Sequence, residues 1–186
     1  MILLLWRLLY TDNEVAQLKM ATSLWLDNEV NGEAITFKDD FLALAADNFY
    51  ASSHSVDFAD PAAGAAMAEW IAKNTNGTLT PQITTDAGQM LSIINTVYFY
   101  DQWIDRFDAS KTAAGTFYLA DGSTVENDFM HQTFASSSYV RGENYTRSQL
   151  ALKDSGSMIF VLPDEGVDVA SLAASPEALQ AALTGG

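Results

Sequence analysis

The sequence predicts an α+β fold in which helices and strands mix along the chain. Three observations favour this class: helical periodicity follows the first predicted strand, a long apolar run follows the second helix, and two short turn signals join later strands. The turn signals predict antiparallel hairpins, not the β-α-β units of a parallel sheet. No internal repeat or low-complexity linker interrupts the pattern.

The N-terminal half predicts two strands and two helices before the long run. Residues 16 to 26 form the first strand, and residues 55 to 59 a short one. Residues 36 to 50 form an amphipathic helix with Thr36 as N-cap, because apolar residues recur at helical spacing. They are Phe37, Phe41, Leu44, Ala45 and Phe49. The second helix begins at Asp60-Pro61, a cap followed by a first-turn proline, and ends near residues 74 to 77.

The second half predicts a long strand, a meander and a terminal helix. Residues 90 to 100 form the strand, whose continuous apolar character suggests burial on both faces. Asp121-Gly122 and Asp154-Ser155-Gly156 mark the two hairpins. A short helical turn is expected at 169 to 172. Ser175 caps a final helix that ends at about Thr184.

Composition excludes several classes of partner and site. The 186 residues include 24 acidic and 9 basic ones, for a net charge of −15, so binding to nucleic acid or to heparin-like polyanions is disfavoured. The charge indicates solubility, with attraction of a basic partner as the alternative. Without cysteine, disulfides and thiolate metal sites are excluded.

The first ten residues are apolar but make a poor signal peptide. The basic n-region is missing, Arg7 interrupts the run, and no small-residue cleavage site follows. The segment is also too short to span a bilayer, so no membrane association is expected. We interpret residues 1 to 10 as the last turns of a core helix beside the sheet.

No catalytic, metal or cofactor site is predicted. Asp154-Ser155-Gly156 superficially resembles a protease nucleophile loop, but the hairpin turn explains it, and His54 and His131 are the sole histidines. The two histidines give no local ligand spacing for a metal. The sequons at Asn76 and Asn144 fall in predicted turns, and the Asn-Gly turn accounts for the first.

The long strand carries a family resemblance. Asn95, Tyr98, Phe99, Trp103 and Phe107 stand in the register of the central strand of the large sheet in serpins. Four further blocks resemble serpin segments in the right order: residues 21 to 26, residues 70 to 77, residues 120 to 132 and residues 157 to 166.

The resemblance implies part of a serpin fold, a single domain that residues 1 to 186 would represent with both ends cut away. In that fold residues 17 to 26 and residues 90 to 100 are expected to be neighbours in one sheet, with residues 60 to 75 as a helix across its face. It implies suicide inhibition of a serine protease, less often a cysteine protease, by insertion of a reactive loop into the large sheet. It does not imply an enzyme. The family's reactive loop lies near the C-terminus, beyond these residues, so this polypeptide is expected to be non-inhibitory. Family members suggest secretion, and the lack of a visible signal peptide leaves the cytoplasm open.

The resemblance also gives candidate residues for sheet opening: Asn95 at the centre of the sheet, Trp103 at its top, and Thr22 and Phe99 beside them. For Asn95 a satisfied core amide is the alternative. Its partner in the family lies in the missing half, so its hydrogen bond is expected to be unmade here. Core packing alone would also explain Trp103. The chain departs from the family at several positions, among them Tyr100-Asp101 for Lys-Gly and Thr22 for Asn, which affects how the sheet is tuned.

A second function remains open, a non-inhibitory structural or interaction fragment. In serpins the central strand has a neighbour from the missing half. Residues 91 to 100 should therefore present an apolar edge that pairs with another copy or with a complementary chain.

Overall fold

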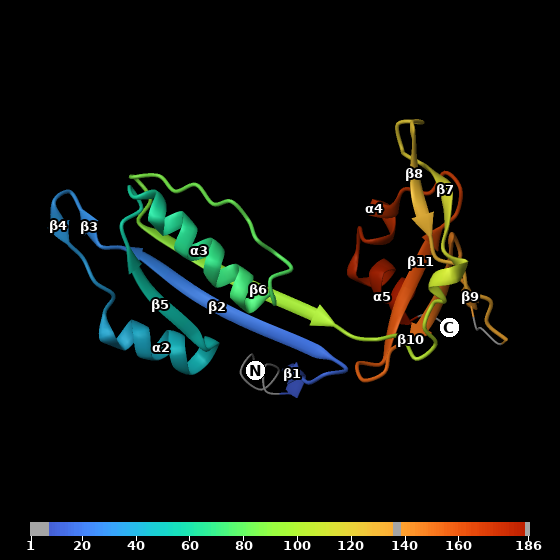
Figure 1. The fold of residues 1–186 in the computed structure, drawn as a ribbon, viewed down its shortest axis with the longest axis horizontal. Helices are drawn as coiled ribbons and strands as arrows, with labels where there is room; N and C mark the ends of the chain where they lie inside the picture. The colour runs from blue at the N-terminus through green and yellow to red at the C-terminus, as the bar shows by residue number, and fades with distance from the viewer. Residues whose placement is uncertain (1–7, 136–138, 185–186) are drawn as a thin grey trace. The chain divides into compact units, whose positions relative to one another are not determined.

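The computed structural model describes residues 8 to 135 and 139 to 184. Residue contacts divide the chain into two compact units, Met1–Tyr100 and Asp101–Gly186, which are described separately (Figure 1). The helix proposed for residues 1 to 10 lies mostly outside the described residues. Within the described part, no helix is both long and apolar enough to cross a bilayer.

The first unit is built on one sheet. Its centre is β2 (Gln17–Asp27), which pairs antiparallel with β6 (Leu91–Tyr100) along ten residue pairs, from Gln17↔Tyr100 to Leu26↔Leu91. The other edge of β2 pairs in parallel with β5 (Ala51–Val56) and, at its start, antiparallel with β1 (Thr11–Asp12). The prediction that the two long strands are neighbours in one sheet is confirmed.

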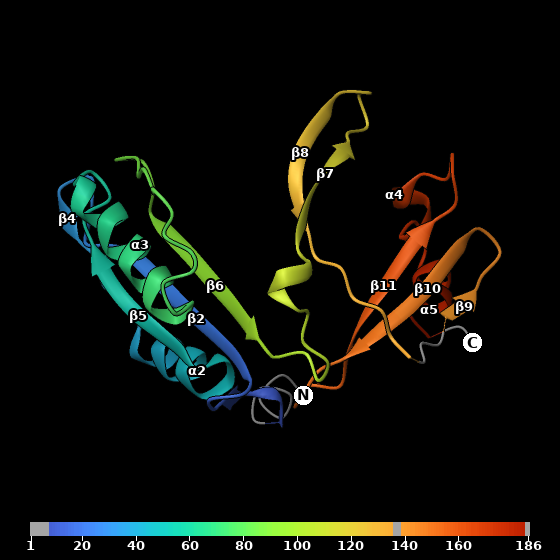
Figure 2. The same cartoon turned by 45° about the vertical axis from the view of Figure 1, so that its right-hand side comes forward.

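Helix α3 (Pro61–Asn74) lies along one face of this sheet (Figures 1 and 2). Asp60 caps it by accepting from the Ala62 amide at 2.8 Å, as predicted. The buried core lies between the helix and the sheet and consists of Trp25, Phe58, Ala63 and Met67. Gly64 is buried against the following segment, because a Cβ there would stand 2.1 Å from the carbonyl oxygen of Ile83.

Helix α2 (Asp39–Phe49) begins three residues later than predicted. Thr36 is not its N-cap. Lys38 occupies that position without a side-chain bond, and the first turn carries Asp39 and Asp40, which suit the positive end of the helix dipole. The helix ends at Tyr50 in the left-handed conformation, which turns the chain directly into β5. The predicted strand at 55 to 59 was therefore placed too late. 

A small hairpin before α2 was not predicted. It joins β3 (Glu29–Val30) to β4 (Glu33–Ala34) through Asn31 and Gly32, both at positive φ.

The second unit holds a three-stranded sheet and a separate ribbon. The sheet runs in the order β11 (Ser157–Pro163), β10 (Tyr145–Ala151), β9 (Tyr139–Arg141), all antiparallel. The ribbon pairs β7 (Ala113–Tyr118) with β8 (Thr124–Phe129). Both hairpin predictions are confirmed, but the strands form two sheets instead of one meander.

Short helices complete the second unit. A 3-10 turn, η1 (Ala109–Lys111), precedes the ribbon, and α4 (Val169–Leu172) and α5 (Pro176–Thr184) follow the sheet. Ser175 caps α5 as predicted, accepting from the Ala178 amide at 3.1 Å. The hydroxyl of Tyr145 donates to the carbonyl of Ala181, which fixes α5 to β10.

Candidate functional site

The structure brings Asn95 and Thr22 together at the middle of the β2–β6 pair. They are register partners, and the Asn95 side-chain nitrogen donates to the Thr22 hydroxyl at 3.0 Å and to the Ala21 carbonyl at 3.2 Å. The amide of Asn95 thus has partners on β2, and the expectation of an unmade hydrogen bond is wrong for its donor side. Thr22, which stands where the family has Asn, supplies the acceptor.

The two faces of β6 differ. Ile94, Thr96 and Tyr98 lie on the face that α3 covers, and Thr96 is 6% exposed. Its hydroxyl has no hydrogen-bond partner among the described residues. On the other face Ile93, Val97 and Phe99 are 66%, 62% and 45% exposed. The prediction of burial on both faces is therefore wrong for these residues, although the strand itself is confirmed.

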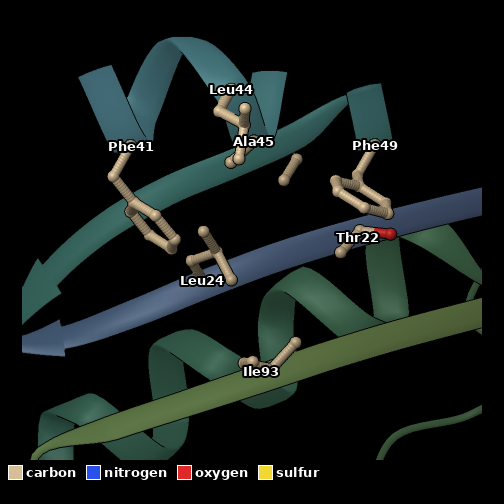
Figure 3. A pocket seen from close by; sticks show the side chains of 8 residues that line it. Thr22, Leu24, Phe41, Leu44, Ala45, Phe49 and Ile93 are labelled. Atoms are coloured by element: carbon tan, nitrogen blue, oxygen red, sulfur yellow. The ribbon is translucent and has the colours of Figure 1, made fainter. Parts of the chain in front are cut away.

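The exposed face forms an apolar groove with α2. Phe41 and Phe49 of α2 point toward β2, over Leu24 and Thr22, and Ile93 of β6 lies beyond them (Figure 3). The groove encloses a cavity of about 250 Å³. Asn95, Val97 and Phe99 alternate with the covered residues, so they share this face with Ile93. Phe99 pairs with Leu18 on β2.

The free edge of β6 completes the site in the first unit. Among the described residues, β2 is the single strand that pairs with β6. A row of main-chain groups therefore faces away from β2 beside exposed apolar side chains. Such an edge is a template for the addition of another strand.

Trp103 belongs to the second unit and packs there. It forms a bridge with Leu152, an edge-to-face contact with Phe107 at a centroid distance of 6.3 Å, and a tilted contact with Phe160 at 6.4 Å. The segment that carries Trp103 also bonds to the end of β10, since the Ile104 amide donates to the Ala151 carbonyl at 3.1 Å. The predicted packing role is thus visible, while its part in sheet opening stays a prediction.

Asp101 is a structural residue that the sequence did not reveal. Its carboxylate accepts from the amides of Gln102 and Ser155 at 2.6 and 2.8 Å, which links the chain before Trp103 to the turn at 154 to 156. Partial burial would raise the pKa of Asp101, but hydrogen bonds from the Ser155 hydroxyl and the Gln102, Ser155 and Asp154 amides outweigh it and lower the pKa. The departure from Lys-Gly at 100 to 101 was the available signal.

The Asp154-Ser155-Gly156 turn makes this structural contact with the Asp101 carboxylate. Ser155 bonds to a carboxylate, and Gly156 has a φ of 91°, as a tight hairpin requires. In the part of the chain that the structure describes, no group of three or more metal-ligating side chains gathers.

Comparison with known proteins assigns the chain to a family. The family model "Serpin (serine protease inhibitor)" matches residues 3–183. Serpin-ZX of Arabidopsis thaliana is 33% identical over 161 residues, which cover 80% of this chain and 39% of that protein. The alpha-1-antitrypsin homolog of Cyprinus carpio is 30% identical over 137 residues, covering 72% and 37%. The chain thus spans less than half the length of these relatives.

Solved structures agree. An Arabidopsis serpin in its native stressed conformation aligns with a TM-score of 0.73 at 27% identity, covering 91% of this chain and 45% of that one. Cleaved kallistatin gives 0.81 at 19% identity, covering 96% and 52%, a likeness of fold alone. Native and cleaved proteins both align, so the likeness selects neither state. The chain belongs to the serpin family, whose members are protease inhibitors rather than enzymes.

Proposed function

We propose that these residues are part of a suicide inhibitor of serine or cysteine proteases, which acts by inserting a reactive loop into the sheet formed by β5, β2 and β6. The free edge of β6 carries the proposal, because strand insertion needs main-chain groups that no neighbouring strand already holds. The family assignment supplies the class of target.

In this proposal the Asn95–Thr22 contact and the packing of Trp103 control how readily the sheet accepts the loop. Asn95 and Phe99 lie on the strand beside which the loop would enter, and Thr22 fastens that strand to β2. Trp103 would act where entry begins. A bound loop would add main-chain hydrogen bonds along β6 and cover part of its exposed apolar side chains.

A polypeptide limited to these 186 residues is proposed to be non-inhibitory and to have no catalytic activity of its own. The family's reactive loop follows the matched segments, and an acyl bond to the protease cannot form without it. Family membership is compatible with secretion and with a cytoplasmic location, and the −15 charge gives no support for nucleic acid as a partner.

The test compares two polypeptides, the 186-residue chain and the product of the complete reading frame that contains it. Each is incubated with trypsin-like and elastase-like proteases and run on a denaturing gel. We expect a covalent, detergent-resistant complex with the longer product alone, and none when the catalytic serine of the protease is replaced by alanine. Cleavage of the longer product without any complex would contradict inhibition.

The second candidate is an interaction fragment that pairs with itself or with a complementary chain. The specific observation is that the same strand edge lies beside Ile93 and Val97, both more than 60% exposed. A gel complex formed by the longer product would not exclude this behaviour in the shorter one, so self-association of the 186-residue chain is measured separately.

A further inference from the structure

A second polar cluster lies on the opposite, α3-covered face of the sheet in the first unit. His54 of β5 stacks on its register partner Trp25, with ring centroids 4.2 Å apart and planes 17° from parallel. The His54 Nε2 atom lies 3.0 Å from the hydroxyl oxygen of Ser52. The indole nitrogen of Trp70, on α3, donates to the same oxygen at 3.2 Å. Ser52 therefore connects the histidine to the helix.

The chemistry of these groups fixes the direction of each hydrogen bond. An indole N–H can only donate, so Ser52 accepts from Trp70. The single hydroxyl proton of Ser52 is then free to be donated to Nε2 of a neutral imidazole that carries its own proton on Nδ1. In this state the hydroxyl both accepts from the helix and donates to the strand.

Protonation of the imidazole reverses the second bond. Nε2 becomes a donor, so the Ser52 oxygen must accept from His54 as well as from Trp70. Its own proton then has to turn toward a different acceptor, and the charged imidazole competes with the Trp70 indole for the Ser52 oxygen. The charged ring also loses solvation in a half-buried position, and this burial lowers the pKa of His54 below its ordinary value.

Other groups face the ring from each neighbouring element. An open cavity of about 370 Å³ beside His54 admits solvent, and α3 contributes Glu69 and Lys73 to its lining. Glu69 favours the charged ring and Lys73 opposes it. On β2, the indole of Trp25 offers a cation–π contact, and Asp27 follows two residues later, with its carboxylate engaged by the amides of Asn28 and Phe58. Lys73 and burial thus disfavour protonation of His54, whereas Glu69 and the Trp25 ring favour it.

We propose that His54 is a proton-controlled latch for helix α3. Neutral His54 holds the Ser52 hydroxyl in the orientation that accepts from Trp70, and protonation loosens the hold of β5 on the helix. The device is independent of the proposed inhibitory function, because it involves neither the β6 edge nor Asn95. It predicts that α3 opens more often at mildly acidic pH while the rest of the sheet stays paired.

The test measures both the protonation of His54 and the opening of helix α3. NMR of the 186-residue chain follows the His54 ring signal with pH, assigned by comparison with the H131Q variant. Native-state hydrogen exchange then follows the α3 amides at pH 7.5 and 5.5, corrected for the intrinsic rate. We expect His54 to titrate below the ordinary value of about 6.5, and the opening of α3 to increase about threefold or more at the lower pH.

Matched variants separate the latch from general acid effects. H54Q, which keeps a neutral hydrogen-bonding side chain, should lose the pH dependence of α3 opening, whereas H131Q, in the second unit and exposed, should retain it. S52A should open α3 at both pH values, while S53A, on the other face of β5, should not. Titration of wild-type His54 at or above the ordinary value overturns the proposal even if H54Q fails to fold. So does persistence of the pH dependence in a folded H54Q.

Discussion

The side-chain nitrogen of Asn95 lies 3.0 Å from the hydroxyl of Thr22, its register partner across the β2–β6 pair. The same nitrogen reaches the Ala21 carbonyl. Residues 73 positions apart in the sequence therefore fasten the two strands by their side chains, in addition to the main-chain ladder. The contact is exposed on the Asn95 side, so its contribution to stability should be modest.

A double-mutant cycle measures this contact. Asn95→Ala removes both hydrogen bonds and should lower the free energy of unfolding by about 0.5–1.5 kcal/mol, and Thr22→Val removes one of them. The coupling energy from urea unfolding of the single and double variants should be about 0.5 kcal/mol or more. Additive single effects would mean that the contact adds nothing to the pairing of the strands.

Removal of the buried Thr96 hydroxyl should have the opposite effect on the free energy of unfolding. It has no hydrogen-bond partner among the described residues, and such a group costs about 1–3 kcal/mol. Thr96→Val keeps the shape and removes the polar atom, so it should leave stability unchanged or raise it by about 1 kcal/mol. Thr22→Val is the matched control, since its hydroxyl is used. A greater loss of stability for Thr96→Val than for Thr22→Val in urea unfolding would contradict this reading.

Gly64 allows α3 to approach the segment around Ile83. A methyl group at this position would meet a backbone oxygen at 2.1 Å, and backbone cannot move aside as a flexible side chain can. Gly64→Ala should therefore destabilise the chain by about 1–3 kcal/mol, although alanine is the better helix former. Ala65→Ser, exposed on the same helix, should change the thermal midpoint little. Equal midpoints for the two variants would show that the contact is not tight.

Local signals predicted much of the fold. Asp60-Pro61 located the start of α3, the Asp-Gly and Ser-Gly turns located both hairpins, and Ser175-Pro176 located α5. The family register placed β6 beside β2. These features depend on neighbouring residues or on a known pattern, which is why a single sequence reveals them.

The rest depends on contacts that a sequence does not display. The start of α2 was misplaced because Thr36 is a good cap in isolation, and the left-handed Tyr50 that precedes β5 carries no distinctive signal. The partners of Asn95, the clamp made by Asp101 and the Ser52 bridge all join residues 18 to 74 positions apart. Ser52 and His54 are two positions apart, so the sequence could place them on one face of a strand. It could not show that Trp70 bonds to the same hydroxyl.

The Asp101 clamp predicts a pH dependence in the second unit. Because the folded state lowers the pKa of Asp101, the clamp stabilises the fold at neutral pH, and its contribution is lost as pH falls through the ordinary carboxyl range and below. Asp101→Asn should cost about 0.5–1 kcal/mol at pH 7, given the surface position, and the difference from wild type should shrink toward pH 3. Asp105→Asn, exposed and with the same change in net charge, is the control for urea unfolding at both pH values. A wild-type advantage that stays constant down to pH 3 would rule the clamp out.

The free edge of β6 predicts self-association that increases with salt. Repulsion between chains of net charge −15 opposes pairing, but at physiological ionic strength it is screened beyond about 8 Å, whereas strand pairing acts at contact. Val97, which is 62% exposed, lies on this strand, and Val97→Lys places a charge beside the edge. The Val97→Lys variant should associate less than wild type, although its less negative net charge weakens the repulsion between chains. Tyr118→Lys, 75% exposed on β7, makes the same change in charge on a strand other than β6 and should associate at least as strongly as wild type. Sedimentation equilibrium from low to high salt measures all three proteins, and a wild-type chain that stays monomeric throughout would show that the edge of β6 does not recruit a second copy.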